Sequence, residues 1–109
     1  MNITQYQGKK RVVLVFTPSA SDARFAQQLA VFEQFESDMK DRDIVVLPIV
    51  GPAEPRLHSQ FRVGVADFRT ILIGKDGNEK HRWAGVAPME QLNHRIDRMP
   101  MRRVEMKER

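Results

Sequence analysis

One stretch decides the fold class, Val12-Val13-Leu14-Val15-Phe16 followed by Thr17-Pro18-Ser19-Ala20-Ser21-Asp22. The consecutive apolar residues, most of them β-branched, predict a central strand that is buried on both faces at about residues 11–17. The serines and the aspartate after it are typical of a helix N-terminus, where side-chain oxygens accept hydrogen bonds from free backbone N–H groups. We therefore predict a buried strand, a turn and a helix, in that order.

The helix is predicted over residues 22–40, because apolar side chains recur there at steps of three and four. Its apolar stripe comprises Phe25, Leu29, Phe32 and Met39, with Phe35 at the margin. A second buried strand is predicted at residues 44–50, and Gly51-Pro52 closes it. Pro55 suits the first turn of a short helix that places Leu57 and Phe61 on one face.

The clearest local signal is the turn Lys75-Asp76-Gly77-Asn78. The Asp-Gly pair tolerates the positive φ angles of a tight hairpin, which predicts antiparallel strands at residues 68–74 and 79–83. A last helix begins at Pro88, and Pro100 stops or kinks it. The core stripe of that helix comprises Met89, Leu92, Ile96 and Met99.

Together these elements predict an α/β protein with the order βαβαββα. A βαβ unit pairs its two strands in parallel, and the hairpin completes a four-stranded mixed sheet of order 4-3-1-2 with helices on both faces. This is the topology of the thioredoxin-like fold. A small flavodoxin-like fragment has similar periodicity, but the Asp-Gly hairpin argues against it. The 109 residues predict one domain, with a core at about residues 10–100 and a basic tail at residues 101–109.

Four blocks of the sequence are distinctive, and they keep their order across residues 10–106. They read Leu14-Val15-Phe16-Thr17-Pro18-Ser19, Arg42-Asp43-Ile44-Val45-Val46, Ile71-Leu72-Ile73-Gly74-Lys75-Asp76-Gly77 and Ile96-Asp97-Arg98-Met99-Pro100-Met101-Arg102-Arg103-Val104-Glu105-Met106. With these blocks the chain resembles the family known as domain of unknown function 4174, described as thioredoxin-like or peroxiredoxin-like. The resemblance implies the thioredoxin-like fold but no established activity, although a peroxidase role has been suggested for some relatives by analogy.

The chain contains no cysteine. A thiolate is the nucleophile of disulfide and peroxide chemistry, and a serine hydroxyl cannot replace it, so thiol oxidoreductase and peroxidase activities are excluded. Thioredoxins also place a cis-proline before the third strand, where this chain has Asp67, Phe68 and Arg69. We therefore do not expect that peptide-docking element.

The formal net charge is +4, and most of it comes from the segment after Asp97, with five basic residues against two glutamates. The rest of the chain is nearly neutral, which argues against a nucleic-acid partner. No apolar stretch approaches the roughly 20 residues needed to span a bilayer, so no membrane association is expected. The polar start predicts a cytoplasmic protein if Met1 is the native start, and a periplasmic or secreted protein if a leader has been removed.

The turn after the first strand is the first candidate site. It forms a helix N-terminus at the carboxyl end of a central strand, where free N–H groups and the positive end of the helix dipole suit an anion. The candidate ligand-binding residues are Thr17, Ser19, Ser21, Asp22 and Arg24. Two interpretations stay open, because the serines and Asp22 can equally cap the helix without any ligand.

Other catalytic arrangements find no support in the sequence. A serine nucleophile needs a base within hydrogen-bond reach, and no histidine lies near Ser19 or Ser21 in the sequence. The histidines are His58, His81 and His94. Their spacing is not that of a metal site, so we expect surface or half-buried histidines, no metal and no cofactor.

The second candidate site is Met99-Pro100-Met101-Arg102-Arg103-Val104-Glu105-Met106. Methionines are flexible and polarizable and suit adaptable contacts, and arginines bind carboxylate or phosphate through two parallel hydrogen bonds. We predict a docking surface for a partner protein that comprises Met99, Met101, Arg102, Arg103 and Met106. The open alternative is that both methionines next to Pro100 complete the core while the arginines stay solvated.

The sequence favours a cysteine-free thioredoxin-like domain that binds a protein or a small anionic ligand without catalysing a reaction. The alternative is a thiol-independent enzyme, or an anion-binding site, at the helix N-terminus of residues 17–22. The sequence identifies neither the ligand nor the partner.

Overall fold

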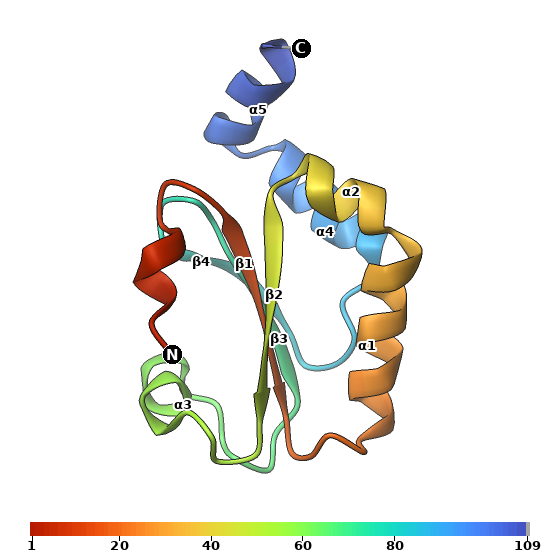
Figure 1. Cartoon of the computed structure of the whole chain (residues 1–109), viewed down its shortest axis with the longest axis vertical. Coiled ribbons are helices and arrows are strands. Elements are labelled where there is room, and N and C mark those ends of the chain that lie inside the picture. The colour runs from red at the N-terminus through yellow and green to blue at the C-terminus, as the bar shows by residue number, and fades with distance from the viewer. Residues whose placement is uncertain (109) are drawn as a thin grey trace.

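The computed structural model describes residues 1–108, in which helices pack on both sides of a four-stranded sheet (Figure 1). The elements in chain order are the 3-10 helix η1 (Ile3–Tyr6), β1 (Arg11–Thr17), α1 (Ala23–Gln34), α2 (Glu36–Asp41), β2 (Ile44–Val50), α3 (Pro55–Phe61), β3 (Arg69–Ile73), β4 (Glu79–Trp83), α4 (Met89–Asp97) and α5 (Pro100–Lys107). The predicted order βαβαββα is present, with the first helix in two pieces and α5 added at the end.

The strands lie in the order β2-β1-β3-β4, which is the predicted order read from the opposite edge of the sheet. β1 and β2 run parallel, with Arg11 opposite Ile44 and Thr17 opposite Val50. β3 is antiparallel to both β1 and β4. Gly77 adopts a φ of 86° in the turn that joins β3 to β4, as the hairpin requires. The α/β class and the mixed sheet are confirmed.

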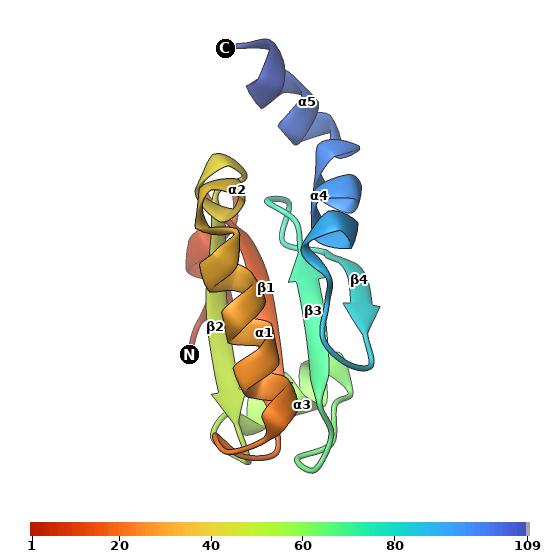
Figure 2. The ribbon, with the colours of Figure 1, turned by 90° about the vertical axis from the view of Figure 1, so that its right-hand side faces the viewer.

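Alternate side chains of β1 build two separate cores, because successive residues of a strand point to opposite faces. Val13 and Val15 pack with α1, α2 and α4 on one face. Leu14 and Phe16 pack with α3 on the other. Figures 1 and 2 show α1, α2 and α4 on one side of the sheet and η1 and α3 on the opposite side, so the prediction of helices on both faces is confirmed.

The predicted helix of residues 22–40 is broken at Phe35. The φ of −112° and ψ of 38° at this residue lie outside the helical region and separate α1 from α2. Phe35 and Leu29 of the expected apolar stripe are exposed, whereas Gln28 is fully buried. The Gln28 side chain accepts a hydrogen bond from the N–H of Ala87 at 2.6 Å, donates one to its carbonyl at 3.1 Å and accepts one from Thr70 at 3.0 Å.

The second strand, predicted to be buried, is an edge strand in which only Ile49 is buried. An edge strand pairs with a neighbour on one side alone, so most of its side chains remain half-buried. Pro48 fits this position, because a residue without an N–H group can occupy the unpaired side of a sheet edge. The apolar run Val45-Val46-Leu47 is therefore no indication of a central strand here.

Most of the predicted basic tail is helical. Residues 100–107 form α5, and Pro100 lies in its first turn, where a missing N–H group leaves no hydrogen bond unmade. In both views α5 extends from α4 past the end of the sheet (Figures 1 and 2). Arg109, the last residue of the predicted tail, lies outside the described residues. No helix within residues 1–108 has the length and hydropathy needed to cross a membrane.

Candidate functional site

The turn after β1 is closed by hydrogen bonds among its own residues. The Thr17 hydroxyl donates to the carbonyl of Ser19 at 2.8 Å, and the hydroxyls of Ser19 and Ser21 lie 3.1 Å apart. Asp22 is the N-cap of α1, and its carboxylate accepts a hydrogen bond from the backbone N–H of Arg24 at 2.9 Å. The five predicted ligand-binding residues therefore lie at one helix start and bond to one another.

Arg24 is held by the same carboxylate. Its Nε and Nη2 atoms donate to Asp22 at 3.0 and 2.8 Å, and its guanidinium carbon lies 4.9 Å from the centre of the Phe68 ring. Hydrogen bonds from the side chain and then the backbone of Arg24 lower the pKa of Asp22, and the same side-chain bond raises the pKa of Arg24. The Asp22 carboxylate thus occupies the position that an anion would take at this helix start.

In the described part of the chain, no catalytic base bonds to Ser19 or Ser21. Within residues 1–108 no histidine bonds to either serine, and the hydroxyls of Ser19 and Ser21 contact each other. His58, expected at or near the surface, is buried, and its ring nitrogens lie 2.8 Å from the carbonyl oxygens of Val63 and Gly51. That histidine ties the loop after β2 to the loop after α3. The described part of the chain contains no group of three or more histidines and carboxylates that could hold a metal ion.

Arg102, predicted to bind a partner, is used inside the domain instead. Its side chain is 2% exposed, with Nη2 donating to the carboxylate of Asp41 at 2.6 Å and Nε to that of Asp97 at 3.1 Å. Asp97 also accepts hydrogen bonds of 3.1 and 3.0 Å from Arg42. The alternative in which Arg102 stays solvated is therefore wrong, because Arg102 is buried and paired with carboxylates of α2 and α4.

Glu105 fixes α5 at a second point. It accepts two hydrogen bonds of 3.1 Å from Arg11 and one of 2.7 Å from Lys75. Burial alone would raise the pKa of Glu105, but the hydrogen bonds from Arg11 and Lys75 outweigh that effect and lower the pKa. We call the charged side chains that fasten α5 the α5 clasp. It comprises Arg11, Asp41, Arg42, Lys75, Asp97, Arg102 and Glu105.

The other residues of the predicted docking surface do not form one face. Met99 is half-buried and packs against the core beneath α4. Met101 and Met106 are 45% and 38% exposed, and Arg103 is exposed. Met101 and Met106 are five positions apart in α5, so their side chains point in different directions from the helix.

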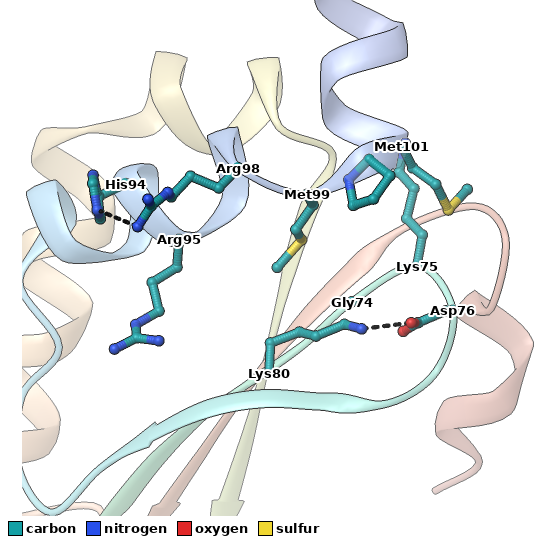
Figure 3. Close-up of a pocket in the computed structure, with 10 residues that line it drawn as sticks. Gly74, Lys75, Asp76, Lys80, His94, Arg95, Arg98, Met99 and Met101 are labelled. Atoms are coloured by element: carbon teal, nitrogen blue, oxygen red, sulfur yellow. Dashed lines mark hydrogen bonds and ion pairs between the residues drawn. The ribbon is translucent and has the colours of Figure 1, made fainter.

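A cleft of about 510 Å³ opens between the β3–β4 hairpin and the junction of α4 with α5 (Figure 3). Its lining includes Met99 and Met101 of the predicted docking surface and one acidic residue, Asp76. The permanently charged basic residues in the lining are Lys75, Lys80, Arg95 and Arg98. Figure 3 shows the guanidinium groups at one end of the cleft and Met101 at the other, with the Met99 side chain between them.

The model of the family described as domain of unknown function DUF4174 matches residues 2–105. The chain belongs to the DUF4174 family. Residues 2–105 contain both the α1 start and the cleft. The resemblance inferred from the four sequence blocks is therefore confirmed.

Relatives of this DUF4174 domain include the Sushi repeat-containing protein SRPX of Homo sapiens and that of Rattus norvegicus. Each is 27% identical over an alignment of 120 residues, which covers 95% of this chain and 26% of the relative. The chain thus spans about a quarter of the length of these relatives.

Two solved structures resemble the DUF4174 domain in fold. The reduced 2-Cys peroxiredoxin of Plasmodium vivax has a TM-score of 0.72 at 16% identity, over 89% of this chain and 81% of that one. StoA from Bacillus subtilis has a TM-score of 0.60 at 11% identity, over 79% of this chain and 81% of that one. These similarities confirm the predicted thioredoxin-like fold.

Sequence reasoning missed the basic end of the cleft in this DUF4174 domain. Arg95 and Arg98 lie three positions apart near the C-terminal end of α4, and that spacing places them on one side of the helix. The three-residue spacing of these arginines is the feature of the sequence from which the pair could have been predicted. Lys80 reaches the same cleft from β4 only because the hairpin and α4 pack side by side, an arrangement that no local pattern indicates.

Proposed function

We propose that this DUF4174 domain is a binding module without thiol chemistry, and that it binds at the cleft beside α5. The proposal rests on a difference between the α1 start and the cleft. The α1 start is closed on itself by Asp22 and Arg24. The cleft, in contrast, contains two guanidinium groups, those of Arg95 and Arg98, with no carboxylate partner within residues 1–108.

The absence of cysteine supports the exclusion of redox catalysis. The thioredoxin-like frame presents the residues of its α1 start at the end of a central strand, and here those residues are serines and a capping aspartate. Within residues 1–108 neither hydroxyl bonds to a base that could deprotonate it, which argues against an activated nucleophile in this turn. The domain can therefore bind through other surfaces without any reaction at the α1 start.

A thiol-independent enzyme, or an anion site, at residues 17–22 is the competing function. It requires activation of Ser19 or Ser21, or displacement of Asp22 from the helix N-terminus. The hydrogen bonds among Thr17, Ser19, Asp22 and Arg24 act against both requirements.

Complementation of a strain that lacks the gene separates the two functions. We expect a Ser19→Ala/Ser21→Ala double variant to restore the phenotype and an Arg95→Gln/Arg98→Gln double variant to fail, with both variants folded by circular dichroism. If the serine variant failed and the arginine variant restored the phenotype, the function would depend on the α1 start. Peroxide consumption and disulfide reduction by the purified chain should stay at background, and enzymatic rates in either assay would refute the proposal.

A further inference from the structure

We infer that the cleft binds a small amphipathic anion, whose carboxylate or phosphate group pairs with Arg95 and Arg98 while its apolar part lies against Met99 and Met101 (Figure 3). The inference rests on the proposed binding function and names the class of ligand. It depends on which charges of the cleft are free, on where the apolar side chains lie and on what holds the walls in place.

The two lysines of the cleft are neutralised within the domain. Lys75 pairs with two carboxylates, those of Asp43 at 2.8 Å and Glu105 at 2.7 Å. Lys80 pairs with Asp76 of the hairpin at 2.5 Å, a contact drawn as a dashed line in Figure 3. The single carboxylate of the lining is therefore used by a lysine and does not compensate the arginines.

The two arginines are the uncompensated charges. Neither Arg95 nor Arg98 has a carboxylate partner in the described part of the chain. Nη1 of Arg98 lies 3.3 Å from Nε2 of His94, a contact that brings no negative charge. Two guanidinium groups on one side of α4 offer the planar, paired donors that match a carboxylate or phosphate.

Side chains, and not the backbone, must hold the anion. The cleft lies at the C-terminal end of α4, where the last carbonyl groups carry partial negative charge and repel anions. The guanidinium groups of Arg95 and Arg98 therefore supply the attraction that the helix end cannot. Removal of these two charges should abolish most of the affinity.

The opposite end of the cleft is apolar. Met99 is half-buried beside the core, and Met101 is 45% exposed. Pro100 lies between them without an N–H group to solvate. An alkyl chain or ring that extends from the anionic group would cover the two thioether side chains, and methionines adapt to such ligands. Each methylene buried there should tighten binding up to about fourfold.

The walls of the cleft are fixed by contacts elsewhere in the domain. Leu92 and Ile96 are fully buried and hold α4 on the sheet. The ion pair between Lys75 and Glu105 holds α5 next to the hairpin. A volume of about 510 Å³ lies within the size range of small-molecule sites. A small organic anion thus fits the cleft better than a macromolecular surface.

A nuclear magnetic resonance titration of the full chain tests the inference, with octanoate and hexyl phosphate as probes. We expect saturable amide shifts confined to residues 74–80 and 94–101. Affinity should rise through butanoate, hexanoate and octanoate. Acetate has the carboxylate without the alkyl chain, and octanamide has the alkyl chain without the negative charge, so each should bind at least tenfold more weakly than octanoate.

Matched variants separate the charges of the cleft from net charge. Arg95→Gln/Arg98→Gln should weaken octanoate at least tenfold, since two charge-assisted contacts are lost. Arg56→Gln/Arg103→Gln removes the same charge from exposed positions outside the cleft and should change affinity less than twofold. Met101→Gln, at an exposed position, should weaken octanoate while leaving acetate unchanged.

Three results would overturn the inference: no saturable binding of either probe, equal affinity for octanamide and octanoate, or wild-type affinity in the Arg95→Gln/Arg98→Gln variant. Any of them leaves the proposed binding function standing if complementation still depends on the cleft. Enzymatic rates in the peroxide or disulfide assays would instead refute the proposed function while leaving the titration result intact.

Discussion

Arg11 in β1 donates two hydrogen bonds of 3.1 Å to the carboxylate of Glu105 in α5, and so joins the first strand to the last helix across 94 positions of the chain. Arg11 is fully buried, and its other polar contact is a 2.8 Å hydrogen bond to the carbonyl of Arg42. A buried guanidinium without its carboxylate loses hydration without compensation. The helix that carries Glu105 is therefore part of the folded domain, and the same helix forms one wall of the cleft.

Glu105→Gln should lower the free energy of unfolding by about 1–3 kcal/mol, because it leaves Arg11 buried beside an uncharged side chain. The estimate stays below that for a fully buried ion pair, since the Glu105 side chain is 23% exposed. Urea denaturation followed by circular dichroism measures the change. Glu108→Gln, at the exposed C-cap residue directly after the same helix, serves as the control and should stay within about 0.5 kcal/mol of wild type. Equal effects of the two substitutions would mean that the clasp does not stabilise the domain.

Stability should fall in acid because of the α5 clasp. Burial alone would raise the pKa of Asp97, but hydrogen bonds from Arg42 and then Arg102 outweigh it and lower the pKa. The unfolded chain then binds this proton at a higher pH than the folded chain. The contribution of Asp97 is therefore complete above the ordinary aspartate pKa of about 3.9 and is lost as the pH falls through the lower, folded value.

Urea denaturation of wild type and Asp97→Asn between neutral and strongly acidic pH measures this dependence. The variant should be less stable at neutral pH and should lose less stability than wild type below about pH 4, because the titrating group is gone. Glu90→Gln, at an exposed position of α4, should keep the wild-type slope. A wild-type acid profile in Asp97→Asn would show that other carboxylates control acid unfolding.

The neighbouring arginines of α5 should behave differently. Arg102→Ala removes the partner of Asp41 and Asp97 and should cost about 2–4 kcal/mol of unfolding free energy. Arg102→Lys should recover only part of this loss, since an ammonium group cannot donate in parallel to two carboxylates from one plane. Arg103→Ala, at an exposed position, should change stability by less than about 0.5 kcal/mol. Thermal unfolding of the three variants distinguishes them, and equal losses at both positions would contradict the assignment.

Local sequence was sufficient for most of the sheet. Apolar runs bounded by turn residues predict β1 and β2, and the Asp-Gly turn predicts the antiparallel hairpin that adds β4; all three strands have the predicted bounds. The edge position of β2 and the break at Phe35 were not predictable in this way. Both depend on which elements lie beside the strand and the helix, and periodicity does not contain that information.

The candidate site was predicted less well for the same reason. The Met-Pro-Met-Arg-Arg segment is predicted as a docking surface, but the structure pairs Arg102 with Asp41 and Asp97 of this chain. The sequence does not distinguish an arginine that pairs within the domain from one that binds a ligand, because the internal partners of an arginine can lie far away in the sequence. Arg95 and Arg98 were overlooked because two arginines on an exposed helix surface are common.

Gln28 offers a test of a buried polar contact that no apolar pattern predicts. Its amide bonds both the N–H and the carbonyl of Ala87, a fully buried residue of the loop before α4. Gln28→Leu keeps the volume but leaves these two backbone groups unsatisfied, so it should cost about 2–4 kcal/mol. Gln27→Leu makes the same replacement at an exposed position and should be nearly neutral. Hydrogen exchange resolves the mechanism, since the Ala87 amide should lose its protection in Gln28→Leu alone. Retained protection at Ala87, or equal losses of stability in both variants, would mean that the loop is held by other contacts.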